Sequence, residues 1–161
     1  MPNKVFKETQ KYIMGEYFPW FFQEYVASVK PIKPLTNEQK LCNFYMTHSY
    51  DNNIILNNKD VWEALEPIII LLKAETLIRI KFNMYPKTFE IIHHPSHVDY
   101  SYKHKGAIFY INTNNGLTVL EDGTEIKSVA NRLLLFDASE PHHSTTTSNE
   151  NRRVNINFNY L

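Results

Sequence analysis

Glycine is scarce in this chain, with only 4 glycines among 161 residues. Loops that bind phosphate groups need several glycines, because the backbone must approach the phosphate closely. Neither the GxGxxG pattern nor the P-loop pattern is present. The sequence therefore argues against a glycine-rich nucleotide-binding loop, and its length suits one domain with a sizeable core.

Cysteine, net charge and long apolar runs are also lacking. Cys42 is the only cysteine, so no disulfide can form within the chain, and we expect a reducing, cytoplasmic location. Lys and Arg total 17, as do Asp and Glu, so there is no clear nucleic-acid signal. The apolar run Ile68–Leu72 is too short to span a membrane. Residues 1–14 carry several charges and no apolar centre, so we expect neither a signal peptide nor a membrane partner.

Helical patterns dominate the first 76 residues. Apolar residues at three- and four-residue steps and one suitable N-cap, Thr36, predict three helices. They are a helix within residues 1–16, a short helix over Glu38–Phe44, and a helix that begins at Asn58 or Asp60 and runs through Leu72. Between the first two, we expect the strongly apolar run Tyr17–Phe22 to anchor the core.

From Leu77 onward the hydrophobic period changes from helical to two. Ile78, Ile80 and Phe82 alternate with polar residues, as in a half-buried strand. Further predicted strands, separated by turn signals, are Thr88–Ile92, His97–Tyr102, Ala107–Asn112, Leu117–Leu120, Arg132–Phe136 and Arg153–Tyr160. Helices followed by strands predict an α+β, mainly β, domain, and many short antiparallel strands predict a jelly roll with packed N-terminal helices.

Six of the seven histidines lie in two places, at 93–104 and at 142–143. His97 and Asp99 are two residues apart on a predicted strand, so their side chains are expected on one face. Imidazole nitrogen and carboxylate oxygen are metal ligands. Two histidines and one carboxylate leave three adjacent positions of the metal open, as in non-haem Fe(II) oxygenases.

The third ligand is less certain from the residues alone, since His142 and His143 are adjacent. His93 and His94 compete with His97, but no carboxylate follows them at the same spacing. We interpret that second pair as lying near the site or exposed.

The last predicted strand separates two arginines. The side chains of Arg153, Asn155, Asn157 and Asn159 share one face, and Val154, Ile156, Phe158 and Tyr160 share the other. Because the apolar face must pack in the core, the asparagine face can line a polar cavity. Arg153 lies on that face, and a guanidinium can bind a carboxylate through two hydrogen bonds. Asn83 and Tyr85 share parity on an earlier strand and could hydrogen-bond the same anion.

Several segments resemble the 2-oxoglutarate/Fe(II) dioxygenases, and among them the small phage-type members. They cover most of the chain: Phe18-Pro19-Trp20-Phe21-Phe22, Asn83-Met84-Tyr85-Pro86, His97-Val98-Asp99-Tyr100, Tyr110-Ile111-Asn112 with Gly116-Leu117-Thr118, Asn131 through Ser139, and Arg153-Val154-Asn155. The six-residue spacing from Phe136 is similar to the family's and favours His142 over His143. Asn131 stands where many members have glycine.

The resemblance implies a double-stranded β-helix and one oxygenase domain over residues 1–161, with 1–76 as helical support and 77–161 as the jelly-roll core. It implies Fe(II) bound by His97, Asp99 and His142. The cosubstrates would be O₂ and 2-oxoglutarate, the latter held by Arg153, Asn155, Tyr85 and Asn83. The expected reaction is hydroxylation of an unidentified substrate with release of succinate and CO₂, in the host cytoplasm if the chain is phage-encoded.

Two other functions fit the same pattern. A jelly roll that only binds a ligand or a partner needs no complete triad. A cupin-like dioxygenase that does not use 2-oxoglutarate has no need for Arg153. Conversion of 2-oxoglutarate to succinate would discriminate the proposed oxygenase from a binding protein.

Overall fold

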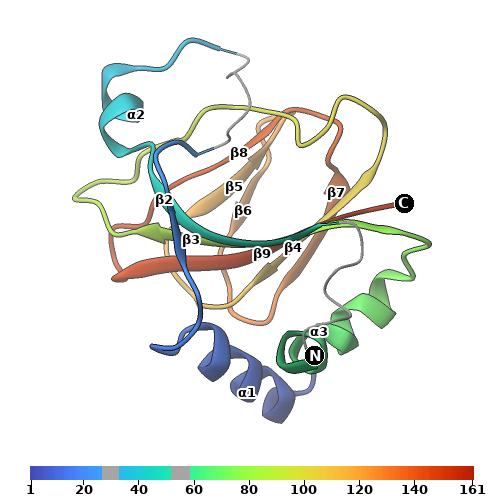
Figure 1. Cartoon of the computed structure of the whole chain (residues 1–161). Coiled ribbons are helices and arrows are strands. Elements are labelled where there is room, and N and C mark those ends of the chain that lie inside the picture. The colour runs from blue at the N-terminus through green and yellow to red at the C-terminus, as the bar shows by residue number, and fades with distance from the viewer. Residues whose placement is uncertain (27–32, 52–58) are drawn as a thin grey trace.

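A computed structural model describes residues 1–26, 33–51 and 59–161 (Figure 1). The described helices are α1 (Asn3–Ile13), α2 (Asn37–Cys42) and α3 (Lys59–Leu72). The described strands are β1 (Phe21–Gln23), β2 (Tyr45–Asp51), β3 (Leu77–Pro86), β4 (Lys105–Tyr110), β5 (Leu117–Leu120), β6 (Glu125–Lys127), β7 (Leu133–Asp137), β8 (His142–Ser144) and β9 (Arg152–Tyr160).

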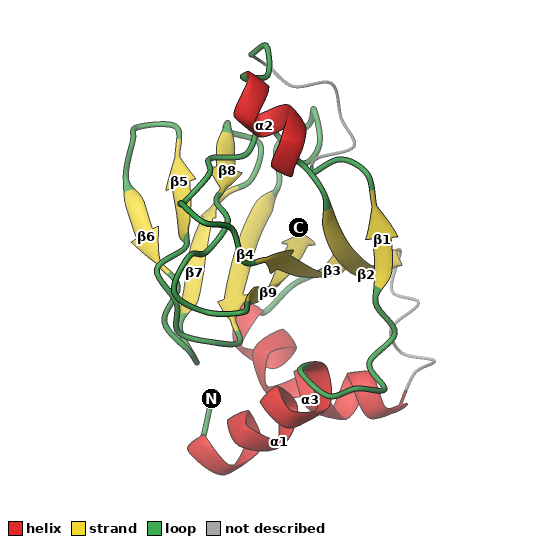
Figure 2. Ribbon diagram, turned by 90° about the vertical axis from the view of Figure 1, so that its left-hand side faces the viewer, coloured by secondary structure: helices red, strands yellow, loops and turns green. Residues whose placement is uncertain are grey.

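The strands form two antiparallel sheets. One sheet has six strands in the order β1-β2-β3-β9-β4-β7, and the other has three in the order β6-β5-β8. The helices lie outside these sheets, with α1 and α3 on one side and α2 on the opposite side (Figures 1 and 2). The predicted mainly β jelly roll, a double-stranded β-helix with packed N-terminal helices, is confirmed.

The main core lies between the six-stranded sheet and the pair α1 and α3. In the register of the sheet, Phe82 of β3, Ile156 of β9 and Phe109 of β4 are direct neighbours. All three side chains are buried in one cluster with Ile13 of α1 and Leu65 of α3. Burial of an apolar side chain of this size stabilises a fold by about 1.5–3 kcal/mol. The apolar face of the central strands is therefore packed in the core, and their other face carries the polar side chains.

The helix predictions are confirmed, with small differences at the ends. Thr36 is the N-cap of α2 in a capping box with Gln39, but the helix ends at Cys42 rather than Phe44. The predicted start of α3 at Asn58 lies outside the described residues, and the helix is described from Lys59. None of the described helices is long and apolar enough to cross a membrane.

Two predicted strands are wrong. Thr88–Ile92 and His97–Tyr102 form no strand, and this part of the chain has only the isolated bridges Lys87↔Thr147, His93↔Thr145 and His97↔His142 in place of a ladder. Pro95 lies between two of these bridges and has no N–H to donate to a ladder. Both segments have the alternation of residue types that is typical of a strand, but neither is paired continuously with a neighbouring strand.

Other differences concern the edges of the sheets. The sequence did not predict β1, β2, β6 or β8, most of which are short. A register irregularity between Leu77 and Arg79 leaves Ile78 only half-buried, so the alternation of β3 begins at Ile80. In the run Tyr17–Phe22, Phe18 is buried as predicted, whereas Tyr17, Phe21 and Phe22 are exposed. An anchor of one buried ring replaces the expected apolar run.

Candidate metal centre

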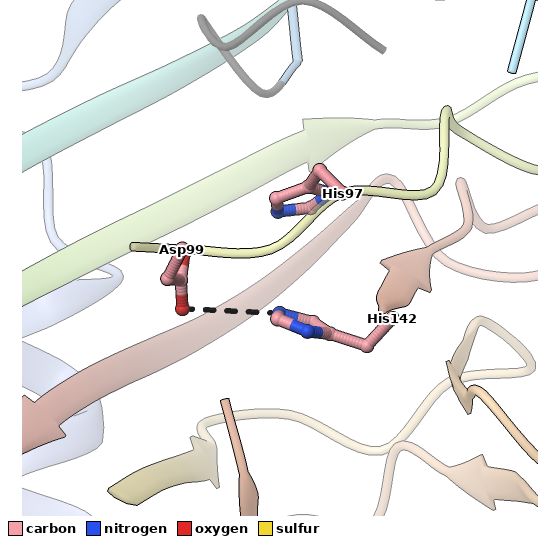
Figure 3. Close-up of side chains that lie close together, drawn as sticks. All are labelled: His97, Asp99 and His142. Carbon is pink, nitrogen blue, oxygen red and sulfur yellow. Dashed lines mark ion pairs between the residues drawn. The ribbon is translucent and has the colours of Figure 1, made fainter. Parts of the chain in front are cut away.

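The structure brings together His97, Asp99 and His142. One ligand atom from each lies within 4.8 Å of the others, and Figure 3 shows the three side chains pointing toward one another. His97 and Asp99 come from a segment without a strand, and His142 comes from β8. The bridge between His97 and His142 aligns the two segments, since each residue's N–H donates to the other's carbonyl at 3.0 and 2.9 Å.

Backbone carbonyls orient both imidazole rings. The Nδ1 atom of His97 is 3.2 Å from the carbonyl oxygen of Pro95, and that of His142 is 3.0 Å from the carbonyl oxygen of Glu140. A ring that donates through Nδ1 keeps the Nε2 lone pair available for a metal. Burial, together with the nearby His142, lowers the pKa of His97 to about 4, so this ring is neutral at pH 7. Neutral imidazole is the form that ligates metal.

Three polar side chains from the large sheet hold Asp99. Arg79 donates to its Oδ1 at 2.7 Å, while Asn157 and Asn159 donate to its Oδ2 at 3.0 and 2.8 Å. Burial alone raises the pKa of Asp99, but the charges and hydrogen bonds around it, above all Arg79, lower it below its ordinary value. Asp99 is therefore an anion fixed in one orientation, and a metal would find the carboxylate already ionised.

Sequence reasoning missed Arg79. Its guanidinium also donates to Asn159 through Nε at 3.1 Å, which joins the arginine, the asparagine and Asp99 in one network. The register places Arg79 of β3 opposite Asn159 of β9. Arg79 shares parity with Asn83 and Tyr85, so the alternation alone places it on the polar face of β3. Its role beside Asp99 could be predicted only with the knowledge that β3 pairs with β9.

Arg153 is fully buried at the other end of the same polar face. Its Nε donates to Ser128 Oγ at 2.9 Å and its Nη2 to Thr118 Oγ1 at 3.0 Å. The guanidinium also lies 5.2 Å from the centre of the Tyr85 ring. Within the described residues, no carboxylate lies within 4.0 Å of it. A buried cation without a counter-ion is costly, so this one is suited to an anionic ligand.

Glycine is required next to Arg153. A Cβ atom added at Gly116 would lie 2.5 Å from Cδ of Arg153 and 2.6 Å from the carbonyl oxygen of Thr146. Neither neighbour has room to retreat, because both are buried. This close approach gives a physical reason for the glycine in the Gly116-Leu117-Thr118 segment.

The remaining predicted cosubstrate residues lie between Arg153 and the triad. Asn83 donates to Asn155 at 3.1 Å, and Tyr85 hydrogen-bonds Ser144. A single cavity is lined by these three predicted residues and by the triad. Arg152 lies on the other face of β9, where its Nη2 donates to the carbonyl oxygen of Met14 at 2.6 Å. The face assignment of β9 is therefore confirmed.

The other histidines have separate surroundings. His143 contacts His93, with Nε2 and Nδ1 3.0 Å apart, and is not part of the three-residue cluster. His94 is buried against the Tyr85 ring, where burial lowers its pKa to about 3. His104 is buried and lies 3.2 Å from Asn159 Nδ2, so it belongs to the network around Asp99.

Comparisons with known proteins show similarity in structure only. No family model and no curated protein matches the chain. A prolyl hydroxylase from Trichoplax adhaerens, solved with a peptide fragment of the hypoxia-inducible factor oxygen degradation domain, is 13% identical over 99% of this chain and 79% of that one, with a TM-score of 0.64.

Two more distant structures carry related names. A 2OG-Fe(II) oxygenase family protein from Burkholderia pseudomallei is 15% identical over 73% of this chain and 67% of that one, with a TM-score of 0.48. The viral collagen prolyl hydroxylase of Paramecium Bursaria Chlorella virus-1, solved with 2OG, is 11% identical over 73% of this chain and 79% of that one, with a TM-score of 0.46. At 13% identity the match to the Trichoplax adhaerens structure shows the fold alone.

Proposed function

We propose that this chain is a 2-oxoglutarate- and O₂-dependent Fe(II) dioxygenase that hydroxylates a substrate and releases succinate and CO₂. One observation carries the proposal. A buried arginine without an acidic partner lies against Thr118 and Tyr85, and these two residues line the same cavity as two histidines and an aspartate whose ligand atoms converge. A dicarboxylate that reaches from the metal to Arg153 would satisfy both features at once.

The donor set fits Fe(II). His97, Asp99 and His142 would hold the ion through two imidazole nitrogens and one carboxylate oxygen and leave positions for other ligands. When bound, the ion would activate O₂ with electrons that come from the oxidative decarboxylation of 2-oxoglutarate. The chain's own residues would supply orientation, because the rings are fixed by backbone carbonyls and Asp99 is fixed by Arg79.

Arg153 would bind the carboxylate of 2-oxoglutarate that is distant from the metal. The Thr118 hydroxyl group accepts from the guanidinium, the Tyr85 ring lies against it, and Asn155 and Asn83 line the cavity that contains the triad. These groups offer hydrogen bonds along the length of a bound dicarboxylate. A closed, polar site of this kind also holds cosubstrate and substrate in one geometry.

The buried Arg153 without an acidic partner also favours this function over the two alternatives. Neither a metal-free jelly roll that binds a partner nor a cupin-like dioxygenase without 2-oxoglutarate gives a reason for the unpaired cation at Arg153. We propose that residues 1–161 form one oxygenase domain, in which residues 1–76 support the jelly-roll core of residues 77–161. The motif resemblance supports a small phage-type enzyme that acts in the cytoplasm.

Paired arginine variants test the proposal. Arg153→Leu removes the buried cation that lies against the lining residues Thr118 and Tyr85, whereas Arg152→Leu removes its neighbour on the opposite face of β9. A hydrogen bond to a charged group contributes roughly 1.5–3 kcal/mol, and about 1.4 kcal/mol corresponds to tenfold in affinity. We expect Arg153→Leu to weaken 2-oxoglutarate binding by at least about tenfold and Arg152→Leu to change it little. Anaerobic titration of the Fe(II) protein, followed by the metal-to-ligand charge-transfer band, measures both.

Arg153→Lys provides a second variant that keeps the charge if Arg153→Leu folds poorly. It should bind 2-oxoglutarate more weakly than the unmodified chain but more tightly than Arg153→Leu. Equal losses in the Arg152 and Arg153 variants would contradict the assignment of Arg153. Unchanged affinity in both Arg153 variants would show that Arg153 does not hold 2-oxoglutarate. Absence of the charge-transfer band from the unmodified chain would exclude 2-oxoglutarate as the ligand of this site and favour a binding protein.

A further inference from the structure

Lys81 is a cation that lines the cavity of the triad, and the proposed reaction does not use it. It lies on the polar face of β3, half-buried, with Nζ 4.9 Å from the centre of the Tyr45 ring. Within the described residues, no carboxylate lies within 4.0 Å of Nζ. The two undescribed stretches, 27–32 and 52–58, contain no Asp or Glu. The amine therefore has no acidic partner in the chain.

Its position separates Lys81 from the cosubstrate. The register of β3 and β9 places Lys81 beside Asn157, which holds Asp99, and places Tyr85 beside Arg153. Lys81 therefore lies level with the residues that hold Asp99, at the other end of the polar face from Arg153. A 2-oxoglutarate molecule that spans from the metal to Arg153 would extend along β9, which lies on the side of β3 opposite to β2.

A polar groove continues from Lys81 toward the outer edge of the sheet. Lys81 and Tyr45 line both the cavity of the triad and this groove, which runs over the same face of β2 and reaches β1. The register of β2 and β3 puts Ser49 beside Lys81 and Thr47 beside Asn83. A molecule in the groove therefore has a continuous path to the metal ligands on the side opposite to Arg153.

Two buried polar atoms along this path have no hydrogen-bond partner. They are Oδ1 of Asn157, in the cavity, and Oγ1 of Thr47, in the groove. Both residues are only 8% exposed. Buried polar atoms are normally paired, so an unpaired one needs an explanation such as a ligand. With Lys81 they offer a positive charge, an acceptor and a hydroxyl group along one path.

We propose that Lys81, Tyr45, Thr47 and Asn157 form the substrate subsite, and that the oxidised substrate carries an anionic group, a carboxylate or a phosphoryl group, that binds Lys81. This inference rests on the proposed function for the identity of the reaction, but not for the anion site itself. Asp51 also lines the groove, beside Arg79 in the register, and its negative charge would repel an anionic group from that part of the groove.

Calorimetric titration with acetate and with inorganic phosphate tests the subsite. The protein is first loaded anaerobically with Fe(II) and saturating 2-oxoglutarate, and ionic strength is held constant with chloride. We expect one anion to bind per chain and Lys81→Met to weaken it at least tenfold, while Lys81→Arg keeps most of the affinity. Lys105→Met is the matched control, because Lys105 also lies over a tyrosine ring, at 5.8 Å from Tyr160, but is exposed on β4. Tighter binding of acetate or of phosphate identifies the anionic group.

The charge-transfer band separates failure of the subsite from failure of the proposed function. If the band forms but neither anion binds in a Lys81-dependent way, the subsite is wrong and the dioxygenase proposal stands. If Lys81→Met weakens 2-oxoglutarate itself tenfold, Lys81 holds the cosubstrate and the substrate assignment is overturned. If no band forms, the reaction is excluded, and Lys81-dependent anion binding would then leave only an anion site without a role in hydroxylation.

Discussion

The cavity of the triad has two walls that differ in regularity. One wall is the sheet face of β3 and β9, where polar residues alternate strictly with core residues and each pair is fixed by a continuous ladder. The other wall is the segment over residues 87–104, which has isolated bridges to its neighbours instead of a continuous ladder. Arg79, which holds Asp99, and Arg153 lie on the strands of the regular wall, whereas His97 and Asp99 come from the irregular wall.

This difference indicates that the paired strands hold the metal ligands of the irregular segment in place. The ladder cannot shift by one residue without turning the apolar face of β9 outward, so its polar side chains are fixed reference points. The irregular segment has few backbone bonds of its own, and the sheet wall must hold its ligands. Asp99 illustrates this dependence, since its three closest donors all lie on β3 or β9.

The sharpest test compares two adjacent histidines at the irregular wall. His142 lies in the cluster with Asp99, whereas His143 pairs with His93. We expect His142→Ala to weaken Fe(II) binding more than about 100-fold, since even residues that only orient a ligand contribute 10–100-fold. His143→Ala should keep most of the affinity. Metal titration measures both, and the opposite order would show that His143 is the ligand.

The next test removes the link between the two walls. Arg79→Leu takes away the ion pair with Asp99 but leaves all three proposed ligands in place. Loss of a residue that orients a ligand weakens metal binding about 10–100-fold. Arg132→Leu is the control, because Arg132 is exposed and donates only to the carbonyl oxygen of Lys127. An Arg79 variant with normal metal affinity would mean that Asn157 and Asn159 suffice to hold Asp99.

A third test uses pH, because His94 is buried and His97 is half-buried at the irregular wall, and both rings are neutral at pH 7. Burial lowers the pKa of His94 to about 3 and that of His97 to about 4 from an ordinary value of 6.5. Below pH 6.5 the unfolded chain therefore binds protons that the folded chain does not. The contribution of these two histidines to the free energy of unfolding is complete above pH 6.5. It decreases as the pH falls toward 4, by about 1.4 kcal/mol per pH unit for each histidine.

A variant at His94 isolates one proton. In the metal-free protein, the free energy of unfolding should change less steeply with pH in His94→Phe than in the unmodified chain. Between about pH 6 and 4.5 the difference in slope should correspond to one proton. Ser144→Ala removes the hydrogen-bond partner of His94 without removing a titrating group, so its slope should stay unchanged. Urea unfolding at several pH values gives the slopes. Equal slopes in all three proteins would mean that His94 is protonated in the folded state.

The same contrast explains what could be predicted from the sequence. The alternation in Arg153–Tyr160 indicated both faces of β9, because a strand buried on one side must divide its residues by polarity. His97 and Asp99 were expected on a regular strand and instead lie on an irregular segment, yet the spacing still brought them together with His142. Arg79 and Lys81 were not predicted, because their positions depend on which strands pair, and pairing leaves no mark in one strand's own pattern.

The smallest expected effect concerns α2, which braces the irregular wall from outside. Gln39 accepts from the Thr36 backbone in the capping box, and its Nε2 donates to the carbonyl oxygen of His93 at 2.6 Å. Thr36→Ala removes the hydroxyl that accepts from the Gln39 N–H at 3.1 Å. Loss of an N-cap costs about 1 kcal/mol, and much of that cost should appear as local opening.

Hydrogen exchange of backbone amides measures that opening. Amides of α2, and that of His94 next to the contact with Gln39, should exchange faster in Thr36→Ala, while those of β9 keep their protection. Thr36→Ser keeps a capping hydroxyl and should behave like the unmodified chain. Faster exchange throughout β9 as well would show that the cap stabilises the whole domain, and the two walls would then open together rather than separately.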